Sequence, residues 1–273
     1  MEPRLLAVGD LHVSYAENRA VTEGLRPTGD GDWLIVAGDV ADKVEDIEWA
    51  LGVLTRRFAR VIWVPGNHEL WTVNDRADGL RGVARYEYLV EMCRGMGVLT
   101  PEDPYALWEG SGGPALIAPL FLLYDYSFLP PGCRTKEEGL AYAYKTGVVC
   151  VDERLLHPDP YPSREAWCAA RVALTEKRLA ECDPELPLVL VNHWPLVRNP
   201  TEVLWYPEFA QWCGTTATAD WHRKFPVKSM IYGHLHIPRE TNYDGVPFEE
   251  VSLGYPREWK KRAKPPQLPR IVL

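Results

Sequence analysis

Hydrophobic residues along this chain occur in short runs, and several runs stop at a cluster of glycine, aspartate, asparagine or histidine. Runs of about four to six residues rich in Val, Ile and Leu, bounded by turn residues, are typical of buried strands. We therefore predict strands at residues 4–8, 33–37, 61–65, 115–120, 188–191, 229–232 and 248–253.

Helical periodicity lies between these runs. Apolar residues at three-and-four spacing predict an amphipathic helix over 44–60, and similar patterns occur over 81–96 and 164–182. The early alternation of strand and helix indicates a layered α/β fold. The segment 70–187 is longer and less regular. We interpret it as insertions, within a single domain spanning 1–273, that form substrate-side loops and helices.

Composition and charge narrow the class of protein. The 273 residues are 46% apolar, which suffices for one large core. The net charge of −8 makes nucleic acid an unlikely partner, because an acidic chain has no long-range attraction for a phosphate backbone. One basic run near the C-terminus is interpreted as a solvated tail, and it comprises Arg257, Lys260, Lys261, Arg262 and Lys264.

Targeting signals are not apparent. No apolar stretch reaches the ~20 residues of a membrane span, and the N-terminus does not resemble a signal peptide. The six cysteines are scattered without a CxxC pair, which is typical of reduced thiols. We therefore expect a cytoplasmic protein without membrane association.

Most of the histidines gather at the ends of the predicted strands. Five of the seven belong to a polar set that consists of Asp10, His12, Asp39, Asn67, His68, His193, His234 and His236. The carboxyl ends of strands in open α/β sheets converge on one crevice, so these residues can meet in one place.

Their chemistry suits divalent transition metals. Imidazole and carboxylate ligands together favour Mn, Fe, Zn or Co over Ca. Asp10 and His12 are two residues apart, as are His234 and His236, so each pair can point to one side of an extended segment. A carboxylate such as Asp39 can bridge two ions. Two such ions, roughly 3.5–4 Å apart, can bind the attacking and leaving oxygens of an in-line displacement.

The ordered motifs resemble the signature of the calcineurin-like metallophosphoesterase superfamily. They are Asp10-Leu-His12, Gly38-Asp39, Gly66-Asn67-His68-Glu69, Asn192-His193 and Gly233-His234-Leu-His236. The resemblance implies a four-layer αββα sandwich of two mixed β-sheets flanked by helices, with a dinuclear metal site at the C-terminal ends of the strands. It also implies hydrolysis of a phosphoester by attack of metal-bound hydroxide.

The resemblance also implies roles for individual residues. One metal is expected to take Asp10, His12 and His236, and the other Asn67, His193 and His234, with Asp39 as the bridge. The two divalent ions are expected to be Mn, Fe or Zn. His68 is expected to act beside the metals as a catalytic residue that stabilises the transition state or protonates the leaving oxygen. Glu69 is expected to orient His68 or a backbone turn.

Departures from the family pattern narrow the substrate class. Protein phosphatases of this kind usually carry arginines after Gly-Asp and after Gly-Asn-His-Glu, whereas this chain has Val40-Ala41-Asp42 and Leu70-Trp71 there. We therefore expect a small-molecule phosphomonoester or phosphodiester, such as a nucleotide. The alternatives are a nuclease, a phosphoprotein phosphatase, an esterase or amidase on the same metal centre, and a catalytically silent scaffold.

Loops beside the motifs are the expected source of substrate specificity. Arg198 is a candidate phosphate contact, because a guanidinium matches phosphate geometry. The candidate substrate-binding residues are Arg198, Tyr124, Asp125, Trp71 and Trp194. Three further tryptophans, Trp205, Trp212 and Trp221, can either line a nucleobase site or pack in the core, and core packing is the favoured interpretation.

Overall fold

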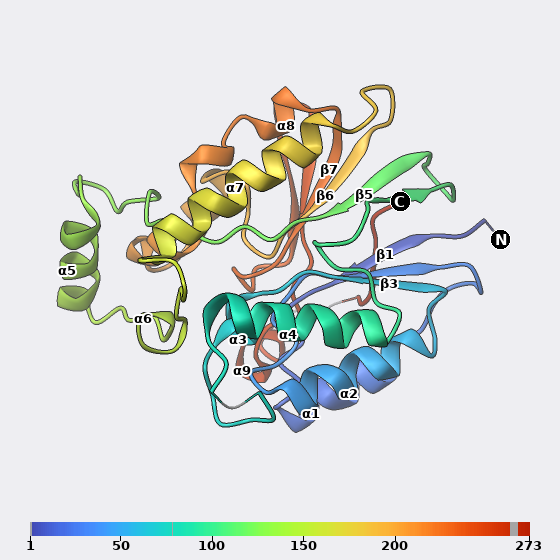
Figure 1. Ribbon diagram of the computed structural model, residues 1–273, viewed down its shortest axis with the longest axis horizontal. Coiled ribbons are helices and arrows are strands. Elements are labelled where there is room, and N and C mark those ends of the chain that lie inside the picture. The colour runs from blue at the N-terminus through green and yellow to red at the C-terminus, as the bar shows by residue number, and fades with distance from the viewer. Residues whose placement is uncertain (1, 78, 263–266) are drawn as a thin grey trace.

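The computed structural model describes residues 2–77, 79–262 and 267–273, and it places two packed β-sheets between layers of helices (Figure 1). The first sheet has the strand order β10-β1-β2-β3, in which β1, β2 and β3 are parallel and β10 is antiparallel to β1. Its strands are β1 (Leu5–Val8), β2 (Trp33–Val36), β3 (Arg60–Trp63) and β10 (Arg270–Ile271).

The second sheet has the strand order β4-β5-β6-β7-β9-β8. The four inner strands are parallel, and the edge strands β4 and β8 run antiparallel to their neighbours. The strands are β4 (Ala106–Trp108), β5 (Ala115–Pro119), β6 (Leu188–Val191), β7 (Val227–Tyr232), β9 (Val246–Glu250) and β8 (Arg239–Tyr243). Both sheets are therefore mixed, and the predicted sandwich is confirmed.

Helices cover the outer face of each sheet (Figure 1). The first sheet is covered by α1 (Ala16–Gly24), α2 (Val44–Thr55) and α4 (Gly82–Gly95), and the second by α7 (Arg164–Ala180) and α8 (Trp221–Lys224). Short elements at the strand ends are α3 (Asn67–Leu70), α6 (Asp152–Leu155), α9 (Pro256–Trp259) and the 3₁₀ turns Asn199–Val203, Pro207–Trp212 and Thr216–Thr218.

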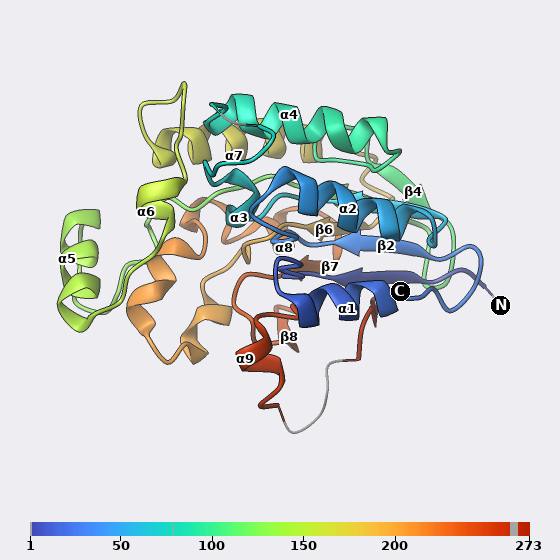
Figure 2. The ribbon, with the colours of Figure 1, turned by 90° about the horizontal axis from the view of Figure 1, so that it is seen from below.

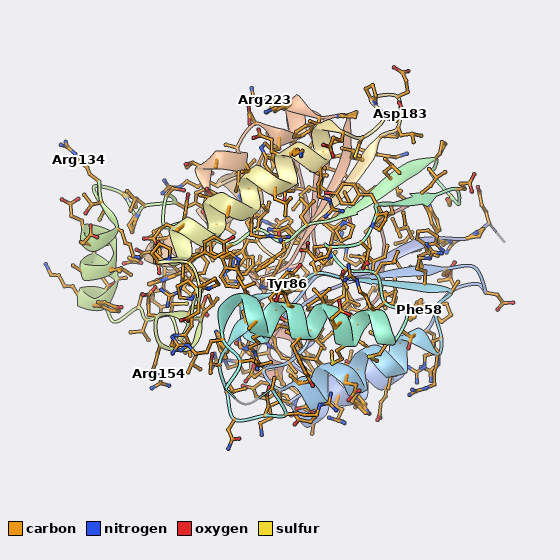
Figure 3. The ribbon with its side chains drawn as sticks, in the orientation of Figure 1. Phe58, Tyr86, Arg134, Arg154, Asp183 and Arg223 are labelled. Carbon is orange, nitrogen blue, oxygen red and sulfur yellow. The ribbon has the colours of Figure 1, made fainter. Side chains whose placement is uncertain are left out.

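The strands are apolar on both faces because each face is packed. In β1, Leu6 and Val8 join the core under the helices, whereas Leu5 and Ala7 join the core between the sheets. This alternation follows from the two-residue repeat of a strand. The side chains fill the space between the layers, and Tyr86 and Phe58 belong to the core beneath α4 and α2 (Figure 3).

The predicted strands and helices are present with shifted ends. The helix predicted over 44–60 ends at Thr55. The prediction extended too far because Phe58 continues the apolar pattern, although it is buried beyond the end of the helix. The strand predicted over 248–253 ends at Glu250, and the chain then continues in extended form toward the first sheet. There Gly9 donates to Val251 O and accepts from Leu253 N. The buried run is thus shared between the two sheets.

Helix α1 was not predicted from the apolar pattern. Its buried residues are Asn18 and Thr22, which are polar. The Asn18 amide donates to Leu11 O at 2.8 Å and to Gly254 O at 2.9 Å, so this helix holds two segments beside the strand ends. Because the buried face of this helix consists of hydrogen-bonded polar side chains, the sequence shows no apolar stripe there.

The segment 70–187 contributes to both the sheets and their surroundings. It includes α4, β4, β5 and α7, which belong to the layers described above. Its remaining helices, α5 (Lys136–Thr146) and α6, lie beyond the strand ends (Figures 1 and 2). Their expected place on the substrate side of the site stays a prediction. Within the described residues, no helix has the length and apolarity needed to cross a membrane.

Candidate metal centre

The polar motif residues occupy the loops that follow the carboxyl ends of strands from both sheets. Several of these loop residues have a positive φ, which costs about 1–3 kcal/mol for a residue with a side chain and persists only where the surrounding structure holds it. They are Asp10 (52°), His12 (41°), Asp39 (53°), His234 (71°) and His236 (56°). The backbone is therefore bent to turn these side chains toward one point.

Two glycines permit the loops to approach each other closely. A Cβ on Gly38, whose φ is +82°, would lie 2.7 Å from Gly66 N and from His193 Nδ1. A Cβ on Gly66 would overlap the Asp39 carboxylate. The glycines of the Gly-Asp and Gly-Asn-His-Glu motifs are thus required for packing around Asp39.

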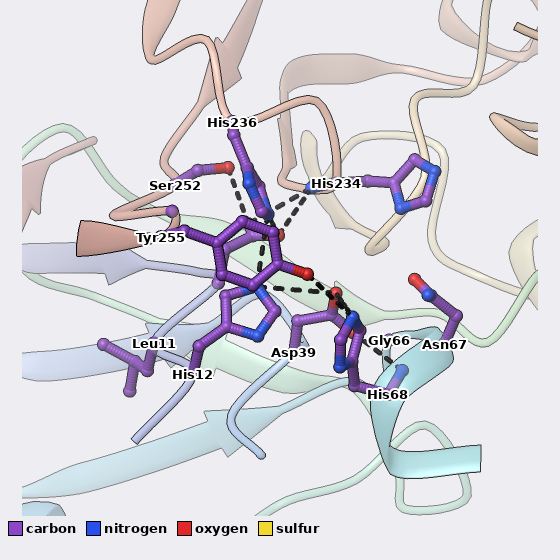
Figure 4. A network of polar contacts seen from close by, with 12 residues as sticks. Leu11, His12, Asp39, Gly66, Asn67, His68, His234, His236, Ser252 and Tyr255 are labelled. Atoms are coloured by element: carbon purple, nitrogen blue, oxygen red, sulfur yellow. Dashed lines mark hydrogen bonds and ion pairs between the residues drawn. The ribbon is translucent and has the colours of Figure 1, made fainter. Parts of the chain in front are cut away.

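The first group of ligand atoms comes from Asp10, His12, Asp39 and His236, whose donor atoms all lie within 4.8 Å of one another. Figure 4 shows His12, Asp39 and His236 of this group. His236 Nε2 is 3.0 Å from Asp10 Oδ1. It is also 3.2 Å from His12 Nε2. Two imidazoles and two carboxylates converging in this way match the ligand set of a transition metal.

The second group shares Asp39 with the first and adds His193 and His234. His193 Nε2 lies 3.4 Å from Asp39 Oδ2 and 3.2 Å from His234 Nδ1. Asn67 Oδ1 lies 3.3 Å from the same His193 nitrogen, so a neutral oxygen joins this group. The seven residues proposed as ligands from the sequence are thereby brought together, with Asp39 between the two groups.

Surrounding residues fix the orientation of these ligands. His236 Nδ1 donates to Glu258 Oε2 at 2.8 Å, and His193 Nδ1 donates to Ala37 O at 2.9 Å. Ser252 Oγ donates to Asp10 at 2.6 Å. Partners of this kind set the tautomer and rotation of metal-binding histidines. Glu258 and Ser252 were not predicted, because they belong to no motif.

Asp152 is a further residue that sequence analysis missed. It lies in α6, is fully buried, and accepts from Asn67 Nδ2 at 3.0 Å and from Trp71 Nε1 at 2.7 Å. Because Nδ2 of the Asn67 amide is bonded to Asp152, its other polar atom, Oδ1, faces His193. One carboxylate therefore orients both a candidate ligand and the indole next to His68.

Glu69 holds the backbone turns rather than His68. Its carboxylate accepts from Val40 N at 2.7 Å, Gly66 N at 2.8 Å and Asp39 N at 3.0 Å. Burial and the nearby Asp39 carboxylate together raise the pKa of Glu69 to about 7, although the backbone hydrogen bonds oppose the shift. Of the two expected roles, the structure supports orientation of the turn.

The electrostatics of the cluster fit bound cations. Burial raises the pKa of Asp10, but His236 and His193 together outweigh it and lower the pKa to about 2. Burial lowers the pKa of His234 to about 3, so this imidazole is neutral and offers a lone pair. Burial also lowers the pKa of His236, yet Asp10 raises it to about 10. The buried carboxylates thus require positive charge beside them, which divalent cations supply in place of protons.

His68 lies beside the two groups and contacts both acidic and aromatic residues. Its Nδ1 donates to Asp42 Oδ1 at 2.6 Å, and its Nε2 is 3.8 Å from Asp39 Oδ2. The Trp71 ring packs on it with a centroid distance of 3.7 Å. Burial lowers the pKa of His68, but Asp39 and Asp42 raise it overall. The two carboxylates therefore favour the protonated form of this imidazole at the edge of the cluster.

Comparison with known proteins agrees with this geometry. The family described as calcineurin-like phosphoesterase matches residues 3–238 of the chain. The chain belongs to the calcineurin-like phosphoesterase family. It is 58% identical over 272 residues to [Acyl-carrier-protein] phosphodiesterase PptH of Mycobacterium tuberculosis, covering 100% of this chain and 84% of that protein.

A solved structure also supports membership of this family. The crystal structure of Phosphopantetheinyl Hydrolase (PptH) from Mycobacterium tuberculosis superposes with a TM-score of 0.95 at 57% identity, covering 100% of this chain and 96% of that one. This calcineurin-like phosphoesterase is therefore a metal-dependent phosphoric ester hydrolase. The family implies divalent metal ions, and the scaffold alternative is set aside.

Around the phosphoesterase centre, the candidate substrate residues have different surroundings. Trp194 and Tyr124 are fully buried with ring centroids 6.1 Å apart, and Trp194 also packs against His193. Asp125 accepts from Ser127 and Thr215, which fixes a turn. Arg198 is exposed and donates to Leu129 O at 2.7 Å. Substrate contact by these residues stays a prediction.

The three further tryptophans do not form one wall. Trp212 and Trp221 are fully buried in different core clusters, whereas Trp205 is 93% exposed. Core packing, the favoured interpretation, is confirmed for two of them. The basic C-terminal run is also not simply a solvated tail, since Lys260 pairs with Glu17 and Arg262 donates to His236 O. Lys264 lies outside the described residues.

A cavity of about 190 Å³ adjoins the phosphoesterase centre. It is lined by His12, Ser14, Tyr15, Asp42, His68, Trp71 and Tyr255. Tyr15 is 47% exposed, so the cavity reaches the surface of the molecule. The cavity therefore lies between the surface and the ligand cluster, with His68 in its wall.

Proposed function

We propose that this phosphoesterase hydrolyses the phosphodiester that joins a phosphopantetheinyl group to a serine of an acyl carrier protein. The observation that carries the proposal is the 58% identity to a protein described as an acyl-carrier-protein phosphodiesterase, which extends over 100% of this chain. The cavity beside His68 is consistent with it, because it reaches the surface and so admits an ester displayed on another protein.

The proposed ligand roles follow the two groups of donor atoms. One ion would be held by Asp10, His12 and His236, the other by Asn67, His193 and His234, and Asp39 would be shared. Two divalent ions bound there supply Lewis-acid activation of water and neutralise charge on the phosphoryl oxygens. Mixed imidazole and carboxylate donors support Mn, Fe or Zn as these ions.

In the proposed reaction, the oxygen of a water molecule bonds to phosphorus, one proton of this water is released to solvent, and the bond from phosphorus to the serine oxygen breaks. The products are the serine hydroxyl and phosphopantetheine. His68 gives a proton from Nε2 to the departing serine oxygen, while Asp42 holds Nδ1 and stabilises the protonated ring. Trp71 packs on a face of the His68 ring and excludes water from that face of the imidazole.

Further proposals concern the setting of the enzyme. The six cysteines are free thiols, which supports the cytoplasm as the place of action. The core shared between the sheets includes residues from both ends of the chain, such as Leu5 and Val251, which supports one domain over 1–273. The helices α5 and α6 are proposed to face the bound partner.

The decisive experiment offers the metal-reconstituted enzyme a phosphopantetheinylated carrier protein. We expect mass spectrometry to show conversion to the unmodified carrier protein with release of phosphopantetheine. The Asp39→Asn variant is the matched control and should leave the carrier protein unchanged. Bis-p-nitrophenyl phosphate, p-nitrophenyl phosphate and nucleotides are tested alongside. Turnover of these compounds without any turnover of the carrier protein would overturn the proposed substrate while leaving the phosphoesterase class intact.

A further inference from the structure

Tyr255 lies next to the candidate metal centre although it belongs to no motif. It precedes the short helix α9, and its backbone N donates to Glu258 Oε2 at 2.9 Å. The same oxygen accepts from His236 Nδ1 at 2.8 Å. The turn that carries Tyr255 is thereby attached to a candidate metal ligand, and the position of its side chain is fixed relative to the centre.

The Tyr255 ring covers the first group of ligand residues (Figure 4). It stacks on His12 with a centroid distance of 4.4 Å and meets His236 edge-on at 4.8 Å. Its hydroxyl lies 3.3 Å from His68 Nε2. The ring is thus packed against ligands, whereas the hydroxyl points to the place where His68 is proposed to act.

A further hydrogen-bond donor at this place would stabilise the negative charge of the substrate. A phosphodiester carries negative charge on its non-bridging oxygens, and this charge grows in the transition state of hydrolysis. No arginine directly follows the Gly-Asp or the Gly-Asn-His-Glu motif in this chain. The described residues that line the cavity also include no lysine or arginine.

Tyr255 offers a suitable donor in that position. A phenol has an unperturbed pKa near 10 and so keeps its proton at neutral pH. We propose that Tyr255 is a catalytic residue whose hydroxyl donates a hydrogen bond to a non-bridging phosphoryl oxygen, in place of an arginine. This inference rests on the phosphoester hydrolysis that underlies the proposed function and not on the identity of the ester.

The test uses Tyr255→Phe, which removes the hydroxyl and keeps the ring that stacks on His12. We expect metal content and melting temperature to remain at the wild-type level. The turnover number should fall about a hundredfold, as for loss of one donor that stabilises transition-state charge. Tyr243→Phe is the matched control, because Tyr243 lies on edge strand β8 and packs on Phe248. It should keep full turnover.

Two comparisons separate this role from other roles. A donor to a non-bridging oxygen serves good and poor leaving groups alike, so the loss should be equal for bis-p-nitrophenyl phosphate and for an alkyl phosphodiester. Adding Tyr255→Phe to His68→Ala should lower turnover further. No added loss would show that Tyr255 only positions His68. A loss confined to alkyl esters, a parallel loss of metal, or full activity of Tyr255→Phe would each overturn the proposal.

Because bis-p-nitrophenyl phosphate needs no carrier protein, the outcome is independent of the proposed substrate. If the enzyme were inactive on the carrier protein but active on this diester, only the proposed substrate would be overturned. If the wild-type enzyme turned over both substrates and Tyr255→Phe were equally active, only the proposed role of Tyr255 would be overturned.

Discussion

Asp42 Oδ1 accepts a hydrogen bond from His68 Nδ1 at 2.6 Å, and this contact joins the loop after β2 to the short helix α3 that follows β3. The bond leaves Nε2 of the imidazole directed at the cavity. It also fixes the ring so that His68 can act on a substrate without binding a metal itself. His68 and Asp42 therefore form a unit beside the ligand cluster.

Replacing His68 by alanine should separate catalysis from metal binding. We expect both ions to be retained and turnover of an alkyl phosphoester to fall by about 10²–10⁴, the usual contribution of a general acid. The loss should be smaller on p-nitrophenyl esters, because p-nitrophenolate departs without a proton. Steady-state kinetics on both substrates, with elemental analysis of the protein, measures this. An equal loss on both would indicate a purely electrostatic role.

Replacing Asp42 by asparagine should have a milder effect of the same kind. The amide keeps the size of the side chain but removes the charge that stabilises the protonated ring of His68. We expect a fall of about 10–100-fold in turnover of the alkyl ester, as is typical for a residue that orients a functional group. In the His68→Ala background the same change should add little. A large additional loss there would show that Asp42 acts by another route.

Asp39 is expected to be the most sensitive carboxylate for metal binding, because its oxygens face both groups of donors. In Asp39→Asn, we expect both ions to be lost together. In His234→Ala, which alters one group, the other ion should remain longer. Titration of the reconstituted protein with a chelator, followed by elemental analysis, gives the stoichiometry. Full metal content and full activity in Asp39→Asn would contradict the bridging assignment.

Asp152 should control metal affinity from outside the ligand set. In Asp152→Ala, the Asn67 amide and the Trp71 indole lose their common acceptor, so the amide can rotate away from His193. We expect an affinity loss of about 10–100-fold for one ion. Asp183→Asn is the control, since Asp183 projects from the surface (Figure 3). Unchanged affinity of both ions in Asp152→Ala would show that Asn67 is oriented by its backbone alone.

Removal of metal and reduction of thiols should affect stability differently. A chelator should lower the melting temperature, because ions that bind the folded state stabilise it by mass action. A reductant should leave it unchanged, because the six cysteines are free. Differential scanning calorimetry with each reagent checks both expectations. A large drop on reduction would show that disulfides contribute to stability.

The sequence by itself determined the parts of this protein that depend on local pattern. Strands packed on both faces need apolar side chains at every position, so β1, β2 and β6 are visible as unbroken runs. The ligand residues follow those runs directly, and a parallel arrangement brings strand ends together whatever the exact register. The convergence of these candidate ligands was therefore predictable from order and spacing.

Only the tertiary structure decided which residues support that centre. Asp152 is 85 residues from Asn67 along the chain, Glu258 is 22 from His236 and Tyr255 is 187 from His68. No periodicity or motif marks these three residues. Whether a polar side chain turns toward the cluster depends on the path of its loop. Asp125 instead holds a local turn and Asn18 holds two loop carbonyls. Such paths are set by long-range packing, which a local sequence pattern does not contain.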